Sequence, residues 1–118
     1  MVNTMEFTQD SRGAIDIMAV KGRIDAVTSP TFDAEMTKWM TAPASTFILD
    51  LTGVNFMSSA ALRVLLSMAK RASKGKKTLM LAGPTAEIRE IFDISNFTSI
   101  FKIFGTVEEA VAAAPPAA

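Results

Sequence analysis

The chain has no cysteine and no histidine among its 118 residues, and these two absences exclude most of the common catalytic centres. Without cysteine, the protein can form no disulfide, no cysteine metal site and no thiolate nucleophile. Without histidine as well, the Ser-His-Asp triad, the Cys-His dyad and the common zinc sites cannot be assembled. The glycine patterns G-x-x-x-x-G-K-[ST] and G-x-G-x-x-G, which hold nucleotide phosphates, are also missing. The sequence therefore predicts a protein that is not an enzyme and that carries no metal and no cofactor.

A net charge is missing too, because 12 lysines and arginines balance 12 aspartates and glutamates. The protein therefore lacks the overall electric field that would attract nucleic acid or an anionic membrane. No stretch approaches the roughly 20 apolar residues that a membrane span requires, and Met1 to Gln9 lacks the basic and apolar segments of a secretion signal. We expect no nucleic-acid partner, no membrane span and a cytoplasmic location.

The length of the chain limits the number of domains. With 49% apolar residues, 118 residues can bury one hydrophobic core but leave no room for a second domain of ordinary size. We expect a single domain over residues 1–114. The remaining residues, 115–118, are expected to form a flexible C-terminal tail.

Short strand-like runs alternate with helical runs along the chain. The predicted strands are 5–9, 15–19, 47–51, 78–82 and 100–104, and the first two form a hairpin that turns through residues 10–13. Helices are predicted from Ser29, over residues 58–74, from Pro84 and from Val107. This order predicts an α/β sandwich, in which about four helices pack on a mostly parallel, mixed sheet of four to five strands, with residues 47–51 in its middle.

Local signals mark where the helices begin. Ser29 can cap free backbone amides, and Pro30 suits the first helical position because that position needs no amide hydrogen bond. Thr106 and Glu109 have the spacing of a capping box. The helix over residues 58–74 is the best defined, because its leucines lie on one face and its basic residues on the other.

Loops at the carboxyl ends of parallel strands are where binding sites form in such sheets. Here these loops are residues 22–28, 52–58 and 83–85, and we expect all three to meet at one edge. Two of them begin or end with small polar residues, which would leave backbone amides accessible.

Two adjacent serines, Ser58 and Ser59, follow an apolar pair and open the best-defined helix. One serine is explained as the helix cap, a role that contributes about 1 kcal/mol. The second hydroxyl would lie at the surface beside the partial positive charge of the helix start, where a phosphate group is well tolerated. Ser59 is therefore a candidate phosphate acceptor, and Arg63 follows one turn later.

The block around the serines resembles a known family. Residues 47–66 contain a strand that ends in Asp-Leu-Thr, a short loop, an apolar pair and a serine pair that opens a helix. This block resembles the hallmark of the bacterial anti-sigma-factor antagonists of the STAS-domain family, in which D-S-S/T-G-L opens the helix. Residues 22–25 with Ser29 and Pro30 resemble that family's G-x-L-D loop and first helix, and residues 91–95 resemble its L-F-x-x-S/T-G segment. The resemblance spans almost the whole chain and implies a STAS-like sandwich.

The resemblance implies a regulatory binding protein. In that family the unphosphorylated antagonist binds an anti-sigma factor that is also a serine kinase, of the histidine-kinase-like ATPase type, and thereby frees a sigma factor for transcription. The kinase phosphorylates the first serine of the motif and so ends binding, and a serine phosphatase restores it. Ser59 stands at that position, with Ser58 as the second candidate. The motif departs from the family where Ser58 replaces aspartate, Ala60 replaces serine or threonine, and Ala61 replaces glycine.

The residues expected to contact the partner surround the serine pair. They are Asp25, Thr52, Met57, Ser58, Ser59, Ala61 and Arg63. Two alternatives keep the fold: a STAS subunit of a lipid or anion transporter, and a STAS scaffold that is not phosphorylated. An enzyme would need a carboxylate-only site of Asp25, Asp50 and Glu87, and nothing in their spacing suggests one.

Overall fold

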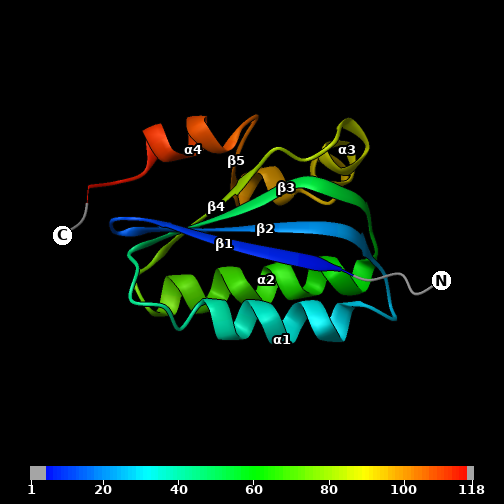
Figure 1. Cartoon of the computed structure of the whole chain (residues 1–118). Coiled ribbons are helices and arrows are strands. Elements are labelled where there is room, and N and C mark those ends of the chain that lie inside the picture. The colour runs from blue at the N-terminus through cyan, green and yellow to red at the C-terminus, as the bar shows by residue number, and fades with distance from the viewer. Residues whose placement is uncertain (1–4, 117–118) are drawn as a thin grey trace.

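Five strands form one mixed sheet in the computed structural model, which describes residues 5–116 (Figure 1). The strands are β1 (Glu6–Arg12), β2 (Ile15–Ile24), β3 (Thr46–Met57), β4 (Thr78–Ala82) and β5 (Lys102–Phe104), and they lie side by side in chain order. Strand β1 is antiparallel to β2, and the other three pairs are parallel. The predicted α/β class, the mixed sheet and the central position of residues 47–51 are confirmed.

Within residues 5–116, four helices lie on the two faces of this sheet. Their bounds are α1 (Ser29–Trp39), α2 (Ser59–Lys74), α3 (Ala86–Ile94) and α4 (Val107–Ala113), with a short 3-10 turn at Phe97–Ser99. Helices α1 and α2 run next to each other across one face, and α4 lies on the opposite side (Figure 1). Of the expected tail at 115–118, residues 115 and 116 follow α4 without regular structure, and residues 117 and 118 lie outside the described residues.

The sheet separates two hydrophobic clusters of unequal size. The larger one joins α1, α2 and α3 to the sheet and includes Phe32, Phe47, Leu65 and Phe92. The smaller one lies under α4 and centres on Ile48, Met80, Ala82 and Ala110. Alternation along β3 explains the division, because neighbouring residues of a strand point to opposite faces.

Trp39 anchors the end of α1 within the larger cluster. Its ring packs edge-on against Phe47 with 5.1 Å between ring centroids, and its Nε1 donates a hydrogen bond of 2.7 Å to Oδ1 of Asp16. The same oxygen accepts a 2.9 Å bond from Nε2 of Gln9. The buried carboxylate is thus hydrogen-bonded, as burial of a polar group requires.

The hairpin between β1 and β2 is tighter than expected. Arg12 pairs directly with Ile15, so the turn contains only Gly13 and Ala14, and the predicted turn through residues 10–13 is wrong. Gly13 has a φ of 63°, the positive value that a two-residue hairpin turn needs at its first position. The strand therefore continues through the polar residues that the sequence pattern assigns to the turn.

Strands β2 and β3 both extend further than expected. The parallel ladder between them continues to the pair Ile24 and Met57, with register irregularities between Ala19 and Lys21 and between Gly22 and Arg23. Residues 22–24 of the predicted loop at 22–28, and residues 52–57 of the one at 52–58, are therefore strand. This long two-stranded arm carries the start of α2 beyond the end of β4, which pairs with β3 only as far as Asp50 and Ala82.

Two helix starts differ from the sequence expectation. Ser29 is already the first residue of α1 and makes no capping hydrogen bond, so its predicted capping role is wrong. Helix α3 begins two residues after Pro84, and Thr85 caps it by accepting a 3.3 Å bond from the amide of Ile88. At α3 the neighbouring side chain of Thr85 supplies the capping oxygen, whereas at α1 the amide of Ser29 donates to the backbone carbonyl of Asp25 at 2.8 Å.

The start of α4 follows the predicted capping box in part. Thr106 accepts a 3.1 Å hydrogen bond from the amide of Glu109, as expected. The carboxylate of Glu109 accepts a 3.0 Å bond from the amide of Gly105, one residue earlier than in the usual box. Both bonds satisfy free amides near the helix start.

Candidate functional site

The two serines at the start of α2 have different structural roles. Ser58 has the extended backbone of a cap residue, and its Oγ accepts a 3.3 Å hydrogen bond from the amide of Ala61. Its own amide donates a 2.9 Å bond to the carbonyl of Ile24, which ties the helix start to the end of β2. Ser59 is the first helical residue and is exposed. The structure thus makes Ser58 the cap, as expected, and leaves the hydroxyl of Ser59 at the surface.

Asp25 organises the loop that lies beside these serines. Its Oδ1 accepts hydrogen bonds from the amides of Val27 at 2.9 Å and Thr28 at 3.0 Å. The hydroxyl of Thr28 donates in turn to the carbonyl of Arg23 at 2.7 Å, which closes the loop. The amide of Thr28 lowers the pKa of Asp25 most, and the Arg23 guanidinium lowers that pKa further, while burial opposes both. Asp25 is therefore a charged, locally fixed group.

Arg23 joins this loop to the end of β3. Its Nε lies 3.0 Å from Oδ2 of Asp25, and its guanidinium carbon stands 4.0 Å above the centre of the Phe56 ring. Phe56 is 37% exposed, although an apolar pair before a helix is typical of buried residues. Sequence reasoning missed both Arg23 and Phe56 as surface residues. Their opposition in the β2–β3 ladder, which no sequence pattern reveals, explains why they meet.

We call the group of Arg23, Asp25, Phe56, Ser58 and Ser59 the serine corner. It combines an exposed hydroxyl, an ion pair and a partly exposed aromatic ring. Val27, in the same loop as Asp25, adds an apolar side chain that is 84% exposed. Aromatic and arginine side chains at a partly desolvated surface are typical of protein–protein contacts.

Three of the other expected contact residues have different surroundings. The side chains of Met57 and Ala61 are only 3% and 0% exposed, so both lie in the core beneath the corner and not on its surface. Arg63 is exposed, and it lines a shallow hollow of about 370 Å³ between α1 and α2 together with Pro30 and Asp33. Arg63 therefore remains a candidate contact one turn after Ser59.

Thr52, the remaining expected contact, belongs to a second group that we call the glycine corner: Asp50, Thr52 and Gly83. The amide of Thr52 donates a 3.0 Å bond to Oδ1 of Asp50, and its hydroxyl donates to the same oxygen. Gly83 has a φ of 70°, and a Cβ there would overlap Oγ1 of Thr52. Thr52 itself is exposed.

The three predicted loops therefore do not all meet at one point, and they adjoin one another only in two pairs. The Asp25 loop adjoins Ser58, and the loop at Gly83 adjoins Thr52. Five positions of β3 separate Thr52 from Met57, because the strand continues where the sequence predicts a loop.

Residues 5–116 contain no cluster of three or more acidic side chains that could hold a metal ion. Over the same residues, no helix combines the length and the apolar character needed to cross a lipid bilayer.

Comparisons with known proteins agree on one family. A family model described as the STAS domain matches residues 8–110. BtrV of Bordetella bronchiseptica, a proposed anti-sigma factor antagonist, is 31% identical over 109 residues, which cover 92% of this chain and 94% of BtrV.

Solved structures share the fold at lower sequence identity. An anti-sigma factor antagonist from Mycobacterium paratuberculosis superposes with a TM-score of 0.86 at 18% identity and covers 93% of both chains. The unphosphorylated form of SpoIIAA, an anti-sigma factor antagonist, superposes with a TM-score of 0.74 at 18% identity, covering 90% of this chain and 93% of that one. SpoIIAA of Bacillus has also been solved in a phosphorylated form, with a TM-score of 0.69 at 17% identity. At these low identities the similarity of the structures establishes the fold alone.

Proposed function

The chain belongs to the STAS-domain family, and we propose that it is an anti-sigma-factor antagonist, a regulatory binding protein that sequesters an anti-sigma factor. The names of its relatives support this function. The observation that carries it is the exposed Ser59 at the start of α2, next to the ion pair and aromatic ring of the serine corner. By sequestering the anti-sigma factor, the protein would free a sigma factor for transcription, so we expect it in the cytoplasm.

Ser59 is the proposed switch of this interaction. Its hydroxyl is exposed, whereas Ser58 is half-buried and its oxygen is engaged with the amide of Ala61. A kinase would therefore reach Ser59 more readily. Phosphorylation would add a charge of about −1.5 to −2 at the helix start, where the helix dipole favours it within the free protein.

The added charge would act against the complex. A phosphate group buried at a contact costs several kcal/mol unless the partner supplies a matching cation. The guanidinium of Arg23 is already shared between Asp25 and Phe56, so the corner offers little spare positive charge of its own. Arg63, one turn along α2, is the basic residue of this chain that would face the new charge.

The three departures from the family motif are compatible with this proposal. Ser58 can replace aspartate as the cap, because both side chains supply an oxygen to the helix amides. Ala61 replaces glycine, but its methyl group is fully buried and so points into the core and not toward a partner. Ala60 removes one hydroxyl from the first turn and leaves Ser59 as its remaining exposed serine.

Binding to the cognate anti-sigma factor tests the proposal directly. We expect Ser59→Ala to bind about as well as the wild type, and Ser59→Asp to bind at least about tenfold more weakly, a difference of about 1.4 kcal/mol, because it adds charge at the contact. Isothermal titration calorimetry gives both affinities.

The matched control is Ser73→Asp. It adds the same charge on the same helix, at an exposed position about 21 Å away along the helix axis. It should leave the affinity unchanged. Equal affinities for Ser59→Ala and Ser59→Asp would rule out a charge switch at this position, and no binding by any variant would rule out the antagonist function with this partner.

The phosphorylation step requires a separate experiment. We propose that the anti-sigma factor is itself a serine kinase of the histidine-kinase-like ATPase type, which would bind ATP and transfer its phosphate to the serine, and that a serine phosphatase reverses the reaction. Incubation with that kinase and ATP, followed by mass spectrometry, should place phosphate on Ser59. Phosphate on Ser58 alone would reassign the acceptor, and none on either serine would leave a STAS scaffold that is not phosphorylated.

A further inference from the structure

Strand β1 forms an open edge of the sheet. It pairs with β2 without a register irregularity from Glu6 to Arg12, it contains no proline, and within the described residues no strand covers its outer side. All its residues except Phe7 are exposed. Regular, uncovered edges of this kind are templates for the addition of another strand, and proteins usually block them with bulges, prolines or short strands. At the other edge, β5 has only 3 residues.

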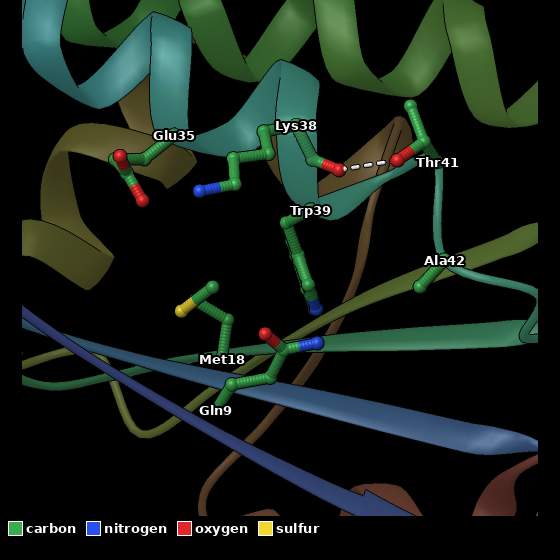
Figure 2. Close-up of a pocket in the computed structure, with 7 residues that line it drawn as sticks. All are labelled: Gln9, Met18, Glu35, Lys38, Trp39, Thr41 and Ala42. Carbon is green, nitrogen blue, oxygen red and sulfur yellow. Dashed lines mark hydrogen bonds between the residues drawn. The ribbon is translucent and has the colours of Figure 1, made fainter.

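A pocket adjoins this edge on the α1 side (Figure 2). Its volume is about 250 Å³, and Gln9 of β1 forms one wall of it. Figure 2 shows Trp39 reaching down from α1 toward Gln9 and Met18, with Glu35 and Lys38 on the same helix. Ala42 adds an apolar surface to the lining. An added strand at β1 would place alternate side chains on this face of the sheet, where pockets give strand addition its specificity.

The hairpin determines which backbone groups of β1 face outward. A two-residue turn closes on a pair that exchanges both of its backbone hydrogen bonds, here Arg12 and Ile15, and the pattern alternates along the strand. The amides and carbonyls of Phe7, Gln9 and Ser11 therefore point away from β2. They form a regular row of free donors and acceptors.

We propose that two copies of the chain associate through β1, antiparallel, with Gln9 opposite Gln9. This register pairs Phe7 with Ser11 of the second copy, so every outward-facing amide of the strand finds an acceptor. It also overlaps all seven residues of both strands, which no other symmetric register does. The contact is isologous, as a twofold dimer requires.

Charge complementarity supports the same register. Glu6 lies opposite Arg12 of the second copy, and because these positions do not exchange hydrogen bonds, their side chains are close. Arg12 is exposed and is held between Asp10 and Glu108. A shift by two residues would instead place Glu6 opposite Asp10, or Asp10 opposite Asp10. Both alternatives oppose like charges, which is unfavourable.

Phe7 accounts for an apolar part of the contact. In this register Phe7 of one copy stands opposite Ser11 of the other, on the α1 face and near the end of β1 that borders the pocket. Phe7 is half-buried in a single copy. It packs there against the larger hydrophobic cluster of its own copy. In the dimer the second copy would cover part of the ring that is still exposed, and the twofold axis repeats this contact.

The first test compares two substitutions at Ser11 in sedimentation experiments across a wide range of protein concentration. The wild type should shift from monomer to dimer, and Ser11→Ala, which keeps the amide, should do the same. Ser11→Pro removes an outward-facing amide, a position where an edge strand tolerates proline, and the shift should be lost. In hydrogen exchange, the amides of Phe7, Gln9 and Ser11 should become protected only at concentrations at which the dimer forms.

The second test uses charge reversal and does not depend on proline. Glu6→Lys alone creates two Lys–Arg oppositions in its dimer, and Arg12→Glu alone creates two Glu–Glu oppositions, so each variant should stay monomeric. In an equimolar mixture, the introduced lysine of one variant lies opposite the introduced glutamate of the other, and the unchanged Arg12 lies opposite the unchanged Glu6. The mixture should therefore recover dimers that contain one copy of each variant.

The proposal is overturned by a wild type that stays monomeric at every concentration, and equally by a mixture that behaves like its separate components. Dimers of unchanged strength in Ser11→Pro would place the interface elsewhere, against the proposal. Because Ser59 lies on α2 and not on β1, Ser59→Ala should dimerise like the wild type, so this inference and the antagonist function can fail independently.

Discussion

The serine corner and the glycine corner lie along the same strand, β3, but they are built in opposite ways. The glycine corner is closed: Asp50 takes both hydrogen bonds of Thr52, and the space beside Gly83 is too small for a methyl group. The serine corner is open: Ser59 is exposed and Phe56 is partly exposed, and only Asp25 and Ser58 are engaged with backbone amides.

This difference separates positions that hold the fold from positions available to a partner. In the glycine corner the amide and hydroxyl of Thr52 are both bonded to Asp50 within the chain, so we expect a substitution there to act on stability. In the serine corner, internal bonds fix the loop and the helix start while other groups remain free at the surface. Substitutions there should act on binding first and on stability second.

The largest expected effect is that of Gly83→Ala on stability. At a φ of 70° a non-glycine residue costs about 1–2 kcal/mol, and the overlap of its Cβ with Thr52 adds about 1–3 kcal/mol. We expect the free energy of unfolding to fall by about 3 kcal/mol, measured by urea denaturation.

Gly13→Ala is the matched control. Gly13 also has a positive φ, 63°, but an added Cβ would have no heavy atom within 4 Å. This variant should lose only about 1 kcal/mol, the conformational part. Equal losses of stability at the two glycines would show that the glycine corner is not closed. Weaker partner binding by folded Gly83→Ala would show that the glycine corner contributes to binding and not to stability alone.

The next effect concerns binding by the serine corner. Phe56→Ala removes the exposed ring beneath the Arg23 guanidinium, and aromatic side chains are frequent hot spots of protein contacts. We expect binding to the anti-sigma factor to weaken by about 2 kcal/mol, or roughly thirtyfold in Kd. Titration calorimetry measures this loss.

Val27→Ala is a useful companion to Phe56→Ala. It shortens a more exposed apolar side chain in the Asp25 loop, so it tests how far the contact extends from the ring. We expect a smaller loss of affinity than for Phe56→Ala. If Phe56→Ala binds like the wild type, the serine corner is not the contact surface.

Much of the fold could be predicted from the sequence because local patterns and packing agree. The apolar run over residues 47–51 predicts a central strand, and it is one. The serine pair before an amphipathic helix predicts one cap and one exposed hydroxyl, and Ser58 and Ser59 fill those roles. In these segments the residues whose pattern predicts a strand or a helix are the same residues that stabilise it.

The two corners could not be separated from the sequence. Residues 52–55 and 21–24 lack strand alternation, and only their pairing with each other makes them strands. Phe56 reads as buried because it is apolar, yet the register of the ladder turns it outward beside Arg23. Long-range pairing therefore decided both the distance between the corners and the composition of the candidate contact surface.

A smaller effect is expected from the removal of two helix caps whose hydrogen bonds have the same length. Ser58 and Thr85 each accept a 3.3 Å bond from the amide three residues later, so Ser58→Ala and Thr85→Ala should each cost about 1 kcal/mol in stability. Only Ser58→Ala should also weaken binding to the anti-sigma factor, because it loosens the helix start that presents Ser59. Thermal unfolding and calorimetry on both variants give the comparison, and equal changes in affinity would contradict it.

The smallest expected effect is a dependence of stability on pH through Asp25. The amide of Thr28 lowers the pKa of this carboxyl below 3.8 in the folded protein, and the Arg23 guanidinium contributes further. A lowered folded pKa means that the charged form stabilises the fold above the unfolded pKa, and that this contribution is lost as pH falls through the folded value. The stability difference between wild type and Asp25→Asn should therefore be largest near neutral pH and shrink below about pH 4.

In Arg23→Gln, NMR titration should still find the pKa of Asp25 below 3.8, because the Thr28 amide remains its main partner. A return of that pKa to its ordinary value in Arg23→Gln would instead assign the order of the loop to the ion pair.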